Sequence, residues 1–196
     1  LQIGSGVEVS GSRKMMAQGV LENTNEELDL AIEGRGYFEV QLQNGERRYT
    51  RNGTFRQDFN GRIVTAEGYL LTDAVTIPPD NQGISITPDG QVLSRGEDNE
   101  MERIGTIRVH VFANEGGLRA AGNNYYQPTA ASGQPEELQP GLQGAGNIRQ
   151  RALERSNVET VDELVSLIVA QRNYEVNSRA IRVSDEMLQQ INQLVR

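Results

Sequence analysis

Hydrophobic residues recur at every seventh position in the C-terminal part of the chain. This series consists of Leu167, Tyr174, Ile181, Leu188 and Val195. A seven-residue spacing keeps one stripe of a helix turned toward a partner helix, as in a coiled coil. No Gly or Pro interrupts residues 158–196. The pattern therefore predicts one long helix over residues 158–196.

Further apolar residues widen this stripe near the start of the predicted helix. The expected packing seam consists of Val161, Leu164, Leu167, Ile168, Tyr174, Ile181, Leu188, Ile191 and Val195. Such a stripe more often faces the core of its own domain. However, about 36 residues of this helix would extend roughly 54 Å at 1.5 Å per residue, which is more than a small β domain can cover. The length favours an assembly interface, in which the polar Asn177 and Ser184 would fix the register.

The preceding residues alternate between apolar and polar positions with a period of two. Phe38, Val40 and Leu42 follow this pattern, which is typical of a half-buried strand. An Asn-Gly pair at residues 44–45 lies between this strand and residues 47–50, and it is the strongest short signal for a hairpin. Similar pairs at 52–53 and 60–61 separate further short runs. We expect many short strands joined by tight turns.

The two patterns define the expected domain organisation. A β-rich body occupies residues 1–146, a connector occupies residues 147–157, and an assembly helix occupies residues 158–196. Residues 128–146 are rich in Pro, Gly, Ser and Gln and are expected to be extended. The fold class is therefore a mainly β body with irregular, Gly/Asn-rich turns, plus one long C-terminal α-helix of the coiled-coil type.

Composition narrows the function classes. The formal net charge is −8 and aromatic residues make up 5 % with no Trp, which argues against binding to nucleic acid or to anionic membrane surfaces. The chain has no Cys, so disulfides and thiolate metal sites are excluded. No stretch has the apolar length of a membrane span, and no cleavable signal peptide is visible. Since the chain begins at Leu1, we expect a fragment or a processed product.

The residues that could carry catalysis or binding are each better explained by a structural role. His110 is the only histidine and lies between two valines, without a local acid or nucleophile. The glycines at 34–36 and 141–146 lack the spacing of a dinucleotide loop and are interpreted as sites of tight backbone geometry. The acidic residues at 26–27 and 97–100 do not follow the calcium-loop pattern. We expect no catalytic, cofactor or metal site and no small-molecule substrate.

Several ordered motifs carry a resemblance to a known family. The chain has LDLAIEGRGYF at residues 28–38, YTRNGTF at 49–55, SNV at 156–158 and QRNYEVNS at 171–178. In these motifs and their order, the chain resembles the bacterial flagellar axial proteins of the rod and hook, most closely those of the distal rod. The residues that match the family signature are Asp29, Ala31, Gly34, Gly36, Phe38, Ser156, Asn157, Gln171, Arg172, Tyr174, Asn177 and Ser178.

The chain departs from the family pattern in three places. Tyr37 stands where Phe is usual, and Arg151-Ala152 stands where a Gly is usual. The N-terminal helix of the family, which pairs with the C-terminal helix in the inner tube of the rod, does not appear in this sequence. The resemblance therefore implies that the C-terminal helix is one half of a helix pair.

The resemblance implies a structural, non-enzymatic role. Members of the family build a helical assembly that spans the periplasm in the basal body and transmits torque from the motor to the hook. They are exported by the flagellar type III apparatus without a cleavable signal peptide. The implied partners are copies of the chain itself and neighbouring rod, hook and envelope-ring proteins.

Two other functions remain as alternatives. A hook or proximal rod subunit would carry the same motifs. A secreted β-rich adhesion or binding module with a coiled-coil stalk would share the Gly- and Asn-rich turns, but it does not explain the ordered motifs. An enzyme that cleaves carbohydrate in the cell wall is a more distant possibility, because no suitable pair of carboxylates is visible.

Overall fold

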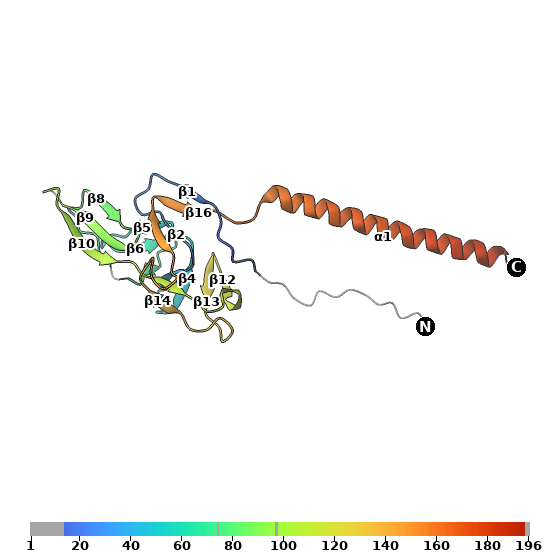
Figure 1. The fold of residues 1–196 in the computed structure, drawn as a ribbon, viewed down its shortest axis with the longest axis horizontal. Coiled ribbons are helices and arrows are strands. Elements are labelled where there is room, and N and C mark those ends of the chain that lie inside the picture. Colours follow the sequence, from blue (N-terminus) through green and yellow to red (C-terminus); the bar gives the residue numbers. More distant parts are fainter. Residues whose placement is uncertain (1–13, 74, 97, 195–196) are drawn as a thin grey trace. The chain divides into compact units, whose positions relative to one another are not determined.

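The computed structural model describes residues 14–73, 75–96 and 98–194. The chain divides into two compact units, Leu1–Arg155 and Ser156–Arg196, and each is described here by itself. The first, which we call the β unit, consists of short strands (Figure 1). The second contains the single long helix α1. A mainly β fold with one long C-terminal helix is thus confirmed. No described helix is both long and apolar enough to span a membrane.

The strands of the β unit are short. They are β1 (Leu21–Asn23), β2 (Leu30–Glu33), β3 (Phe38–Gln41), β4 (Arg47–Thr50), β5 (Phe55–Gln57), β6 (Ile63–Thr65), β7 (Leu70–Leu71), β8 (Gly83–Ile86), β9 (Gln91–Arg95), β10 (Met101–Thr106), β11 (Val109–Val111), β12 (Arg119–Gly122), β13 (Tyr125–Gln127), β14 (Glu136–Leu138), β15 (Asn147–Gln150) and β16 (Ala152–Glu154). A single turn of 3-10 helix occupies Glu115–Gly117.

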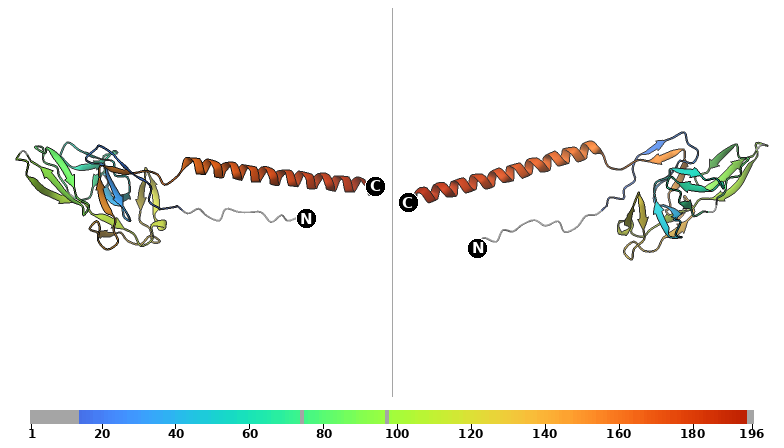
Figure 2. Two further views of the ribbon diagram at one scale, coloured as in Figure 1. Left: turned by 45° about the horizontal axis from the view of Figure 1, so that its top comes forward. Right: turned by 180° about the vertical axis from the view of Figure 1, so that it is seen from behind.

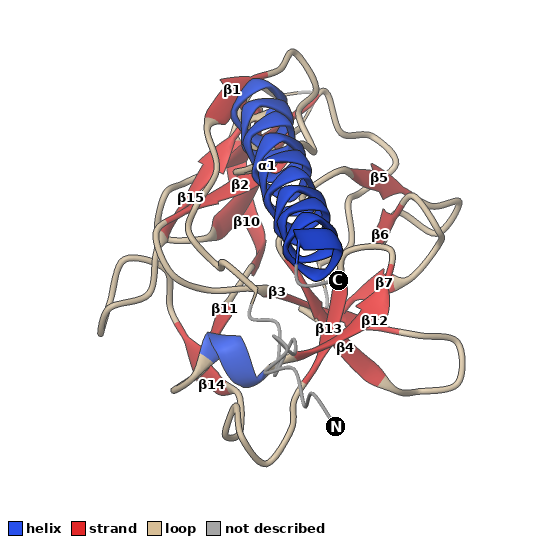
Figure 3. Ribbon diagram, turned by 90° about the vertical axis from the view of Figure 1, so that its right-hand side faces the viewer, coloured by secondary structure: helices blue, strands red, loops and turns tan. Residues whose placement is uncertain are grey.

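The largest sheet has seven strands in the order β12-β13-β4-β3-β7-β6-β5. Its β3–β4 hairpin forms at the Asn-Gly pair predicted from the sequence, with Phe38 opposite Thr50 and Gln41 opposite Arg47. Gly45 has a φ of +83° and donates its N–H to the carbonyl of Leu42, as such a tight turn requires. The β5–β6 hairpin closes in a similar way at Gly61, with a φ of +81°. The strands of the sheet are drawn in red in Figure 3.

The remaining strands form one three-stranded sheet, β10-β9-β8, and three two-stranded ladders. In the ladders β11 pairs with β14, β15 with β2, and β16 with β1. The later strands of the last two ladders, β15 and β16, lie within residues 147–157, which the sequence pattern assigns to a connector. Their partner strands lie more than a hundred residues earlier in the chain.

Two buried clusters form the core of the β unit. The larger one brings together side chains from both ends of the sequence, including Leu30, Phe38, Val92, Val109 and Ile148. The rings of Phe38 and Phe55 meet edge to face, with their centroids 5.2 Å apart. The smaller cluster consists of Tyr37, Tyr49, Phe112 and Leu118. The larger cluster draws most of its side chains from the strands, whereas Tyr37, Phe112 and Leu118 of the smaller one lie in the segments between strands.

Helix α1 spans Thr160–Leu194 without a break, as the two further views in Figure 2 also show. Its first intrahelical hydrogen bond runs from the N–H of Glu163 to the carbonyl of Glu159. Asp162 and Glu163 lie in the first turn, where negative charge is favourable to the helix dipole. The side chain of Ser156 accepts a hydrogen bond from the N–H of Val158 at 3.2 Å, just before the helix.

Candidate assembly interface

A cluster around Arg51 connects three distant segments of the β unit. The Arg51 guanidinium donates hydrogen bonds to the carbonyls of Ile32, Gly34 and Gly36 at 3.0–3.1 Å. It also pairs with the carboxylate of Glu154 at 2.7 Å. Their side chains are only 19 % and 11 % exposed, so this ion pair is shielded from water. We call these five residues, together with Gln18, the Arg51 hub.

The Arg51 hub also fixes the segment that precedes β1. The side chain of Gln18 donates to the carbonyl of Ile32 and accepts from the N–H of Gly34, both at 3.0 Å. The second carboxylate oxygen of Glu154 accepts the N–H of Gly19 at 2.8 Å. In addition, the N–H of Arg155 binds the carbonyl of Val20 at 2.9 Å. The segment that precedes β1 and the segment that follows β16 are therefore fixed next to each other.

The signature glycines of the β unit are positions of close backbone approach. Gly34 has a φ of +117°, and a Cβ there would lie 2.9 Å from the Cα of Gly146. Gly36 has a φ of +138°, and a Cβ there would lie 1.9 Å from a methyl group of Val109. A side chain at either position would displace its neighbours. These glycines allow the conformation of the loop that Arg51 binds. Their role is therefore structural.

The other signature residues of the β unit are buried. Asp29 is 6 % exposed, and its backbone carbonyl accepts the N–H of Ala152 at 3.3 Å. Ala31 and Phe38 are fully buried. Ala31 lies opposite Arg149 in the β2–β15 ladder. The N-terminal motif therefore joins the early strands to the last strands of the unit.

His110 lies in a buried polar group on β11. It is 6 % exposed, and its Nδ1 is 3.9 Å from the carboxylate of Glu39, beyond hydrogen-bonding distance. The Tyr49 hydroxyl donates to the same carboxylate at 2.7 Å, and Arg47 approaches it to 3.3 Å. Burial lowers the pKa of His110 and favours the neutral imidazole, although Glu39 opposes this shift. Because Tyr49 donates to Glu39 and not to His110, this group does not form a nucleophilic triad.

Asp73 is a second buried titratable group. Its carboxylate accepts the N–H of Arg108 at 2.9 Å, and its side chain is only 11 % exposed. Burial raises the pKa of Asp73 to about 6, while the hydrogen bond and charge of Arg108 oppose the shift. The folded protein therefore binds this proton more tightly than the unfolded chain does.

We expect Asp73→Asn to stabilise the β unit at neutral pH. Asp73 lowers stability as the pH rises from about 4 to 6, where the unfolded carboxyl has ionised but the folded one resists ionisation. Asparagine keeps an acceptor for Arg108 and removes this cost, about 3 kcal/mol. Urea unfolding at pH 4 and pH 7 measures the effect. A gain of equal size at both pH values would contradict it.

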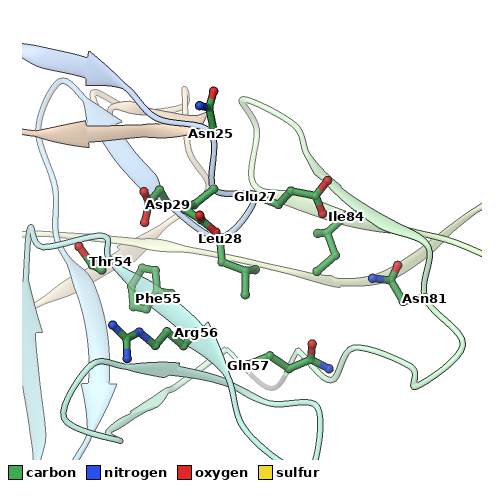
Figure 4. Close-up of a pocket in the computed structure, with 11 residues that line it drawn as sticks. Asn25, Glu27, Leu28, Asp29, Thr54, Phe55, Arg56, Gln57, Asn81 and Ile84 are labelled. Atoms are coloured by element: carbon green, nitrogen blue, oxygen red, sulfur yellow. Dashed lines mark hydrogen bonds between the residues drawn. The ribbon is translucent and has the colours of Figure 1, made fainter.

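A hollow of about 720 Å³ lies on the β unit, and Figure 4 shows the residues that line it. Leu28, Phe55 and Ile84 supply apolar side chains to it. At its rim, Glu27 accepts the N–H of Ile84 at 3.1 Å and pairs with Arg151 at 2.9 Å. Glu27 therefore takes part in contacts that hold the fold together. Among the described residues, no group of three or more His, Asp or Glu side chains is arranged to hold a metal ion.

The predicted seam on α1 is exposed along its described length. Its side chains are between 48 % and 76 % exposed, with Tyr174 the most exposed at 76 %. Leu188 and Ile191 lie within α1, but their side chains are outside the described part of the structure, as is Val195. Of the C-terminal signature residues, Ser156, Asn157, Gln171, Arg172 and Asn177 are also exposed, and Ser178 is half-buried.

A second exposed apolar series on α1 was not part of the predicted seam. Val169, Val176 and Val183 are 52 %, 65 % and 43 % exposed. They have the same seven-residue spacing, and they follow Leu167, Tyr174 and Ile181 by two residues each. The same periodicity in the sequence could have identified them.

Comparison with protein families defines the class of protein. Residues 31–94 match the family model described as the flagellar hook protein FlgE/F/G D1 domain. Residues 149–194 match the family model described as the flagellar basal body rod FlgEFG protein C-terminal. The first match includes β3 and most of β2, which carry the N-terminal motif. The second covers β16 and α1. Both describe axial proteins of the bacterial flagellum.

Curated relatives identify the branch within this class. The flagellar basal-body rod protein FlgG of Buchnera aphidicola (subsp. Schizaphis graminum) is 42 % identical over 99 % of this chain and 75 % of its own length. The FlgG proteins of Borreliella burgdorferi and Bacillus subtilis are 39 % and 37 % identical over the whole chain and 75 % of their own lengths. The chain belongs to the FlgG family of flagellar basal-body rod proteins. The resemblance seen in the sequence motifs is confirmed.

Proposed function

We propose that the chain is a structural subunit of the distal rod of the flagellar basal body, and that it assembles there into a helical shaft that carries torque. The observation that supports this most strongly is the identity of about 40 % to FlgG proteins over nearly the whole chain. The family is a structural component of the flagellum. In this role the chain acts on no substrate. It works by packing its side chains against those of other subunits.

The exposed surface of α1 supports the assembly part of the proposal. Eleven large apolar side chains in the described part of α1 are at least 43 % exposed. A large exposed apolar surface on a soluble protein often marks a site where it binds a partner. Contacts between two different faces of identical subunits generate a filament when the rotation from one subunit to the next does not close a ring.

Further parts of the proposal concern location and partners. We place the subunit in the part of the rod that spans the periplasm, exported without a cleavable signal peptide. Its partners are copies of itself and neighbouring rod, hook and envelope-ring proteins. A hook or proximal rod subunit is the second candidate, favoured by the hook-protein description of the matched D1 family.

We expect Leu167→Asp combined with Ile181→Asp to abolish self-association of the chain while the β unit stays folded. Both side chains are more than half exposed on α1, so the change adds charge to the seam without disturbing a core. Light scattering reports the assembly size, and circular dichroism reports the fold. If the assembly size were unchanged, the seam would not be the assembly interface.

The location is tested directly in the organism that makes this chain. An antibody raised against the β unit should label the rod in purified basal bodies, below the hook. Labelling of the hook alone would favour the second candidate. Basal bodies without any label would overturn the rod assignment.

A further inference from the structure

Two turns of the seven-stranded sheet have the same backbone but hold their asparagines differently. The β3–β4 turn contains Asn44-Gly45, and the β5–β6 turn contains Asn60-Gly61. The φ angles of Gly45 and Gly61 are +83° and +81°. Each glycine donates its N–H to the carbonyl of the residue that begins the turn, at 2.9 and 3.0 Å. The two turns are therefore a matched pair that differs mainly in its side chains.

In the β3–β4 turn, the side-chain amide of Asn44 is held at both ends. Its oxygen accepts the N–H of Glu46 at 3.0 Å, and its nitrogen donates to the carboxylate of Glu46 at 3.4 Å. Leu42 begins this turn, and its apolar side chain does not compete for the N–H of Glu46. The amide of Asn44 must break these hydrogen bonds before it can rotate.

In the β5–β6 turn, the side chain of Asp58 takes over these contacts. Asp58 stands where the first turn has Leu42. Its Oδ1 accepts the N–H of Asn60 and the N–H of Arg62, both at 2.8 Å. Within the described part of the structure, the side-chain amide of Asn60 has no hydrogen bond, and the residue is exposed. The amide is therefore free to rotate toward the nitrogen of Gly61.

The backbone around Gly61 is fixed while this side chain moves. The carbonyl of Gly61 accepts the N–H of Ile77 at 2.7 Å. The nitrogen of Gly61 thus stays beside Asn60, and the side chain of Asn60 is the mobile group. The third Asn-Gly pair lacks such a free side chain, because the oxygen of Asn52 accepts both the N–H and the hydroxyl of Thr54, at 3.2 and 3.1 Å.

We propose that Asn60 is a site of spontaneous deamidation in the folded protein, and that it reacts faster than Asn44 and Asn52. The modification needs no enzyme, since its reactants are the chain itself and water. The proposal goes beyond the rod function and does not depend on it.

The reaction begins with attack by the backbone nitrogen of Gly61 on the side-chain carbonyl carbon of Asn60. Glycine favours the attack because it has no side chain that would hinder the approach. A new C–N bond closes a succinimide ring, and the side-chain amide leaves as ammonia together with the proton of the Gly61 N–H. Water then opens the ring at one of its two carbonyls. The product is aspartate, or isoaspartate where the main-chain carbonyl is hydrolysed, and nothing is oxidised or reduced.

Both products change the tip of the β5–β6 hairpin. Each adds a carboxylate to a turn that already contains the carboxylate of Asp58. Isoaspartate also lengthens the main chain by one carbon, inside the turn that the hydrogen bond from Gly61 to Asp58 closes. Phe59 is 95 % exposed at the same tip. Deamidation therefore alters the charge and shape of the surface around this apolar side chain.

The three rates are measured by peptide mapping of the unmodified chain with mass spectrometry. Trypsin cuts after Arg and places the asparagines in separate peptides, residues 36–47, 52–56 and 57–62. Conversion of an amide into a carboxyl group changes the peptide mass, and electron-transfer fragmentation separates isoaspartate from aspartate. The chain is incubated at neutral and mildly alkaline pH, because loss of the Gly61 N–H proton speeds the attack.

We expect Asn60 in the folded chain to react about fivefold faster than Asn44 or Asn52, a factor that corresponds to one ordinary hydrogen bond. In urea the three rates should become similar, because the contacts that distinguish the sites are lost. Equal rates in the folded chain, or a faster reaction at Asn44 or Asn52, would overturn the proposal. A difference that persisted in urea would assign the effect to local sequence and also overturn it.

Two reciprocal variants test the cause. Asp58→Leu leaves the N–H of Arg62 to the oxygen of Asn60, as in the first turn, and should slow deamidation of Asn60 about fivefold. Leu42→Asp should speed the reaction at Asn44 by a similar factor. Asp80→Leu, at an exposed position outside both turns, serves as the control and should change neither rate.

Circular dichroism verifies that each variant is folded. Each of the two turns tests the proposal separately, so a variant that fails to fold leaves the other one to decide. Unchanged rates at the altered turn of a folded variant would show that the carboxylate at the start of the turn does not control the reaction, and would overturn the proposal.

Discussion

Gly53→Ala will destabilise the β unit by about 4 kcal/mol or more, at the upper end of single-residue effects. A Cβ at Gly53 would lie 1.5 Å from the carbonyl oxygen of Leu30, and this obstacle is backbone rather than a mobile side chain. The clash also separates the two segments joined by the hydrogen bond from the N–H of Leu30 to the carbonyl of Gly53, 3.0 Å long. Urea unfolding followed by Tyr fluorescence measures the loss.

Two other glycines provide matched controls for this prediction. Gly45 has a φ of +83° and open space around it, so Gly45→Ala should cost only the strain of the left-handed conformation, about 1 kcal/mol. Gly96 has neither a left-handed φ nor a neighbour within contact, so Gly96→Ala should stay within about 0.5 kcal/mol of the original protein. If all three substitutions had similar costs, the contact with Leu30 would not be the cause.

Arg51→Ala is the second substitution with a large expected effect, a loss of about 3 kcal/mol. It removes the partner of the shielded Glu154 carboxylate and leaves the carbonyls of Ile32, Gly34 and Gly36 without their donor. An uncompensated charge that is shielded from water is costly. The free energy of unfolding from urea titration gives the size of the loss.

A second substitution separates the charge from the packing of the Arg51 hub. Arg51→Met combined with Glu154→Leu removes both charges and should recover part of the lost stability. Arg62→Ala breaks an ion pair with Asp58 whose arginine is 46 % exposed, and it should cost at most about 1 kcal/mol. If the double variant is no more stable than Arg51→Ala, the unpaired Glu154 charge is not the main cost, and the lost hydrogen bonds to the loop carbonyls dominate.

The sequence predicted those parts of the fold that depend on local patterns. The helix was expected over residues 158–196 and is found at Thr160–Leu194, because its periodicity extends over many turns. The β3–β4 hairpin formed at the predicted turn, since two neighbouring residues determine that geometry. The coiled-coil pairing of α1 stays a prediction.

Features that depend on distant partners could not be predicted in this way. Nothing in residues 147–154 indicates which strands they join, but β15 and β16 pair with strands near the start of the unit. The motif at residues 49–55 includes Arg51, yet nothing in it indicates that its partner is Glu154, a residue 103 positions later. Only the three-dimensional structure shows that these motifs are parts of one cluster.

The antiparallel β1–β16 ladder has a practical consequence for protein engineering. Because Leu21 lies opposite Glu154, the incoming and outgoing strands occupy adjacent positions at one end of the ladder. A unit with neighbouring entry and exit points can be inserted into a loop of an unrelated host protein without forcing the two sides of that loop apart. The β unit is thus suited to transplantation as a cassette.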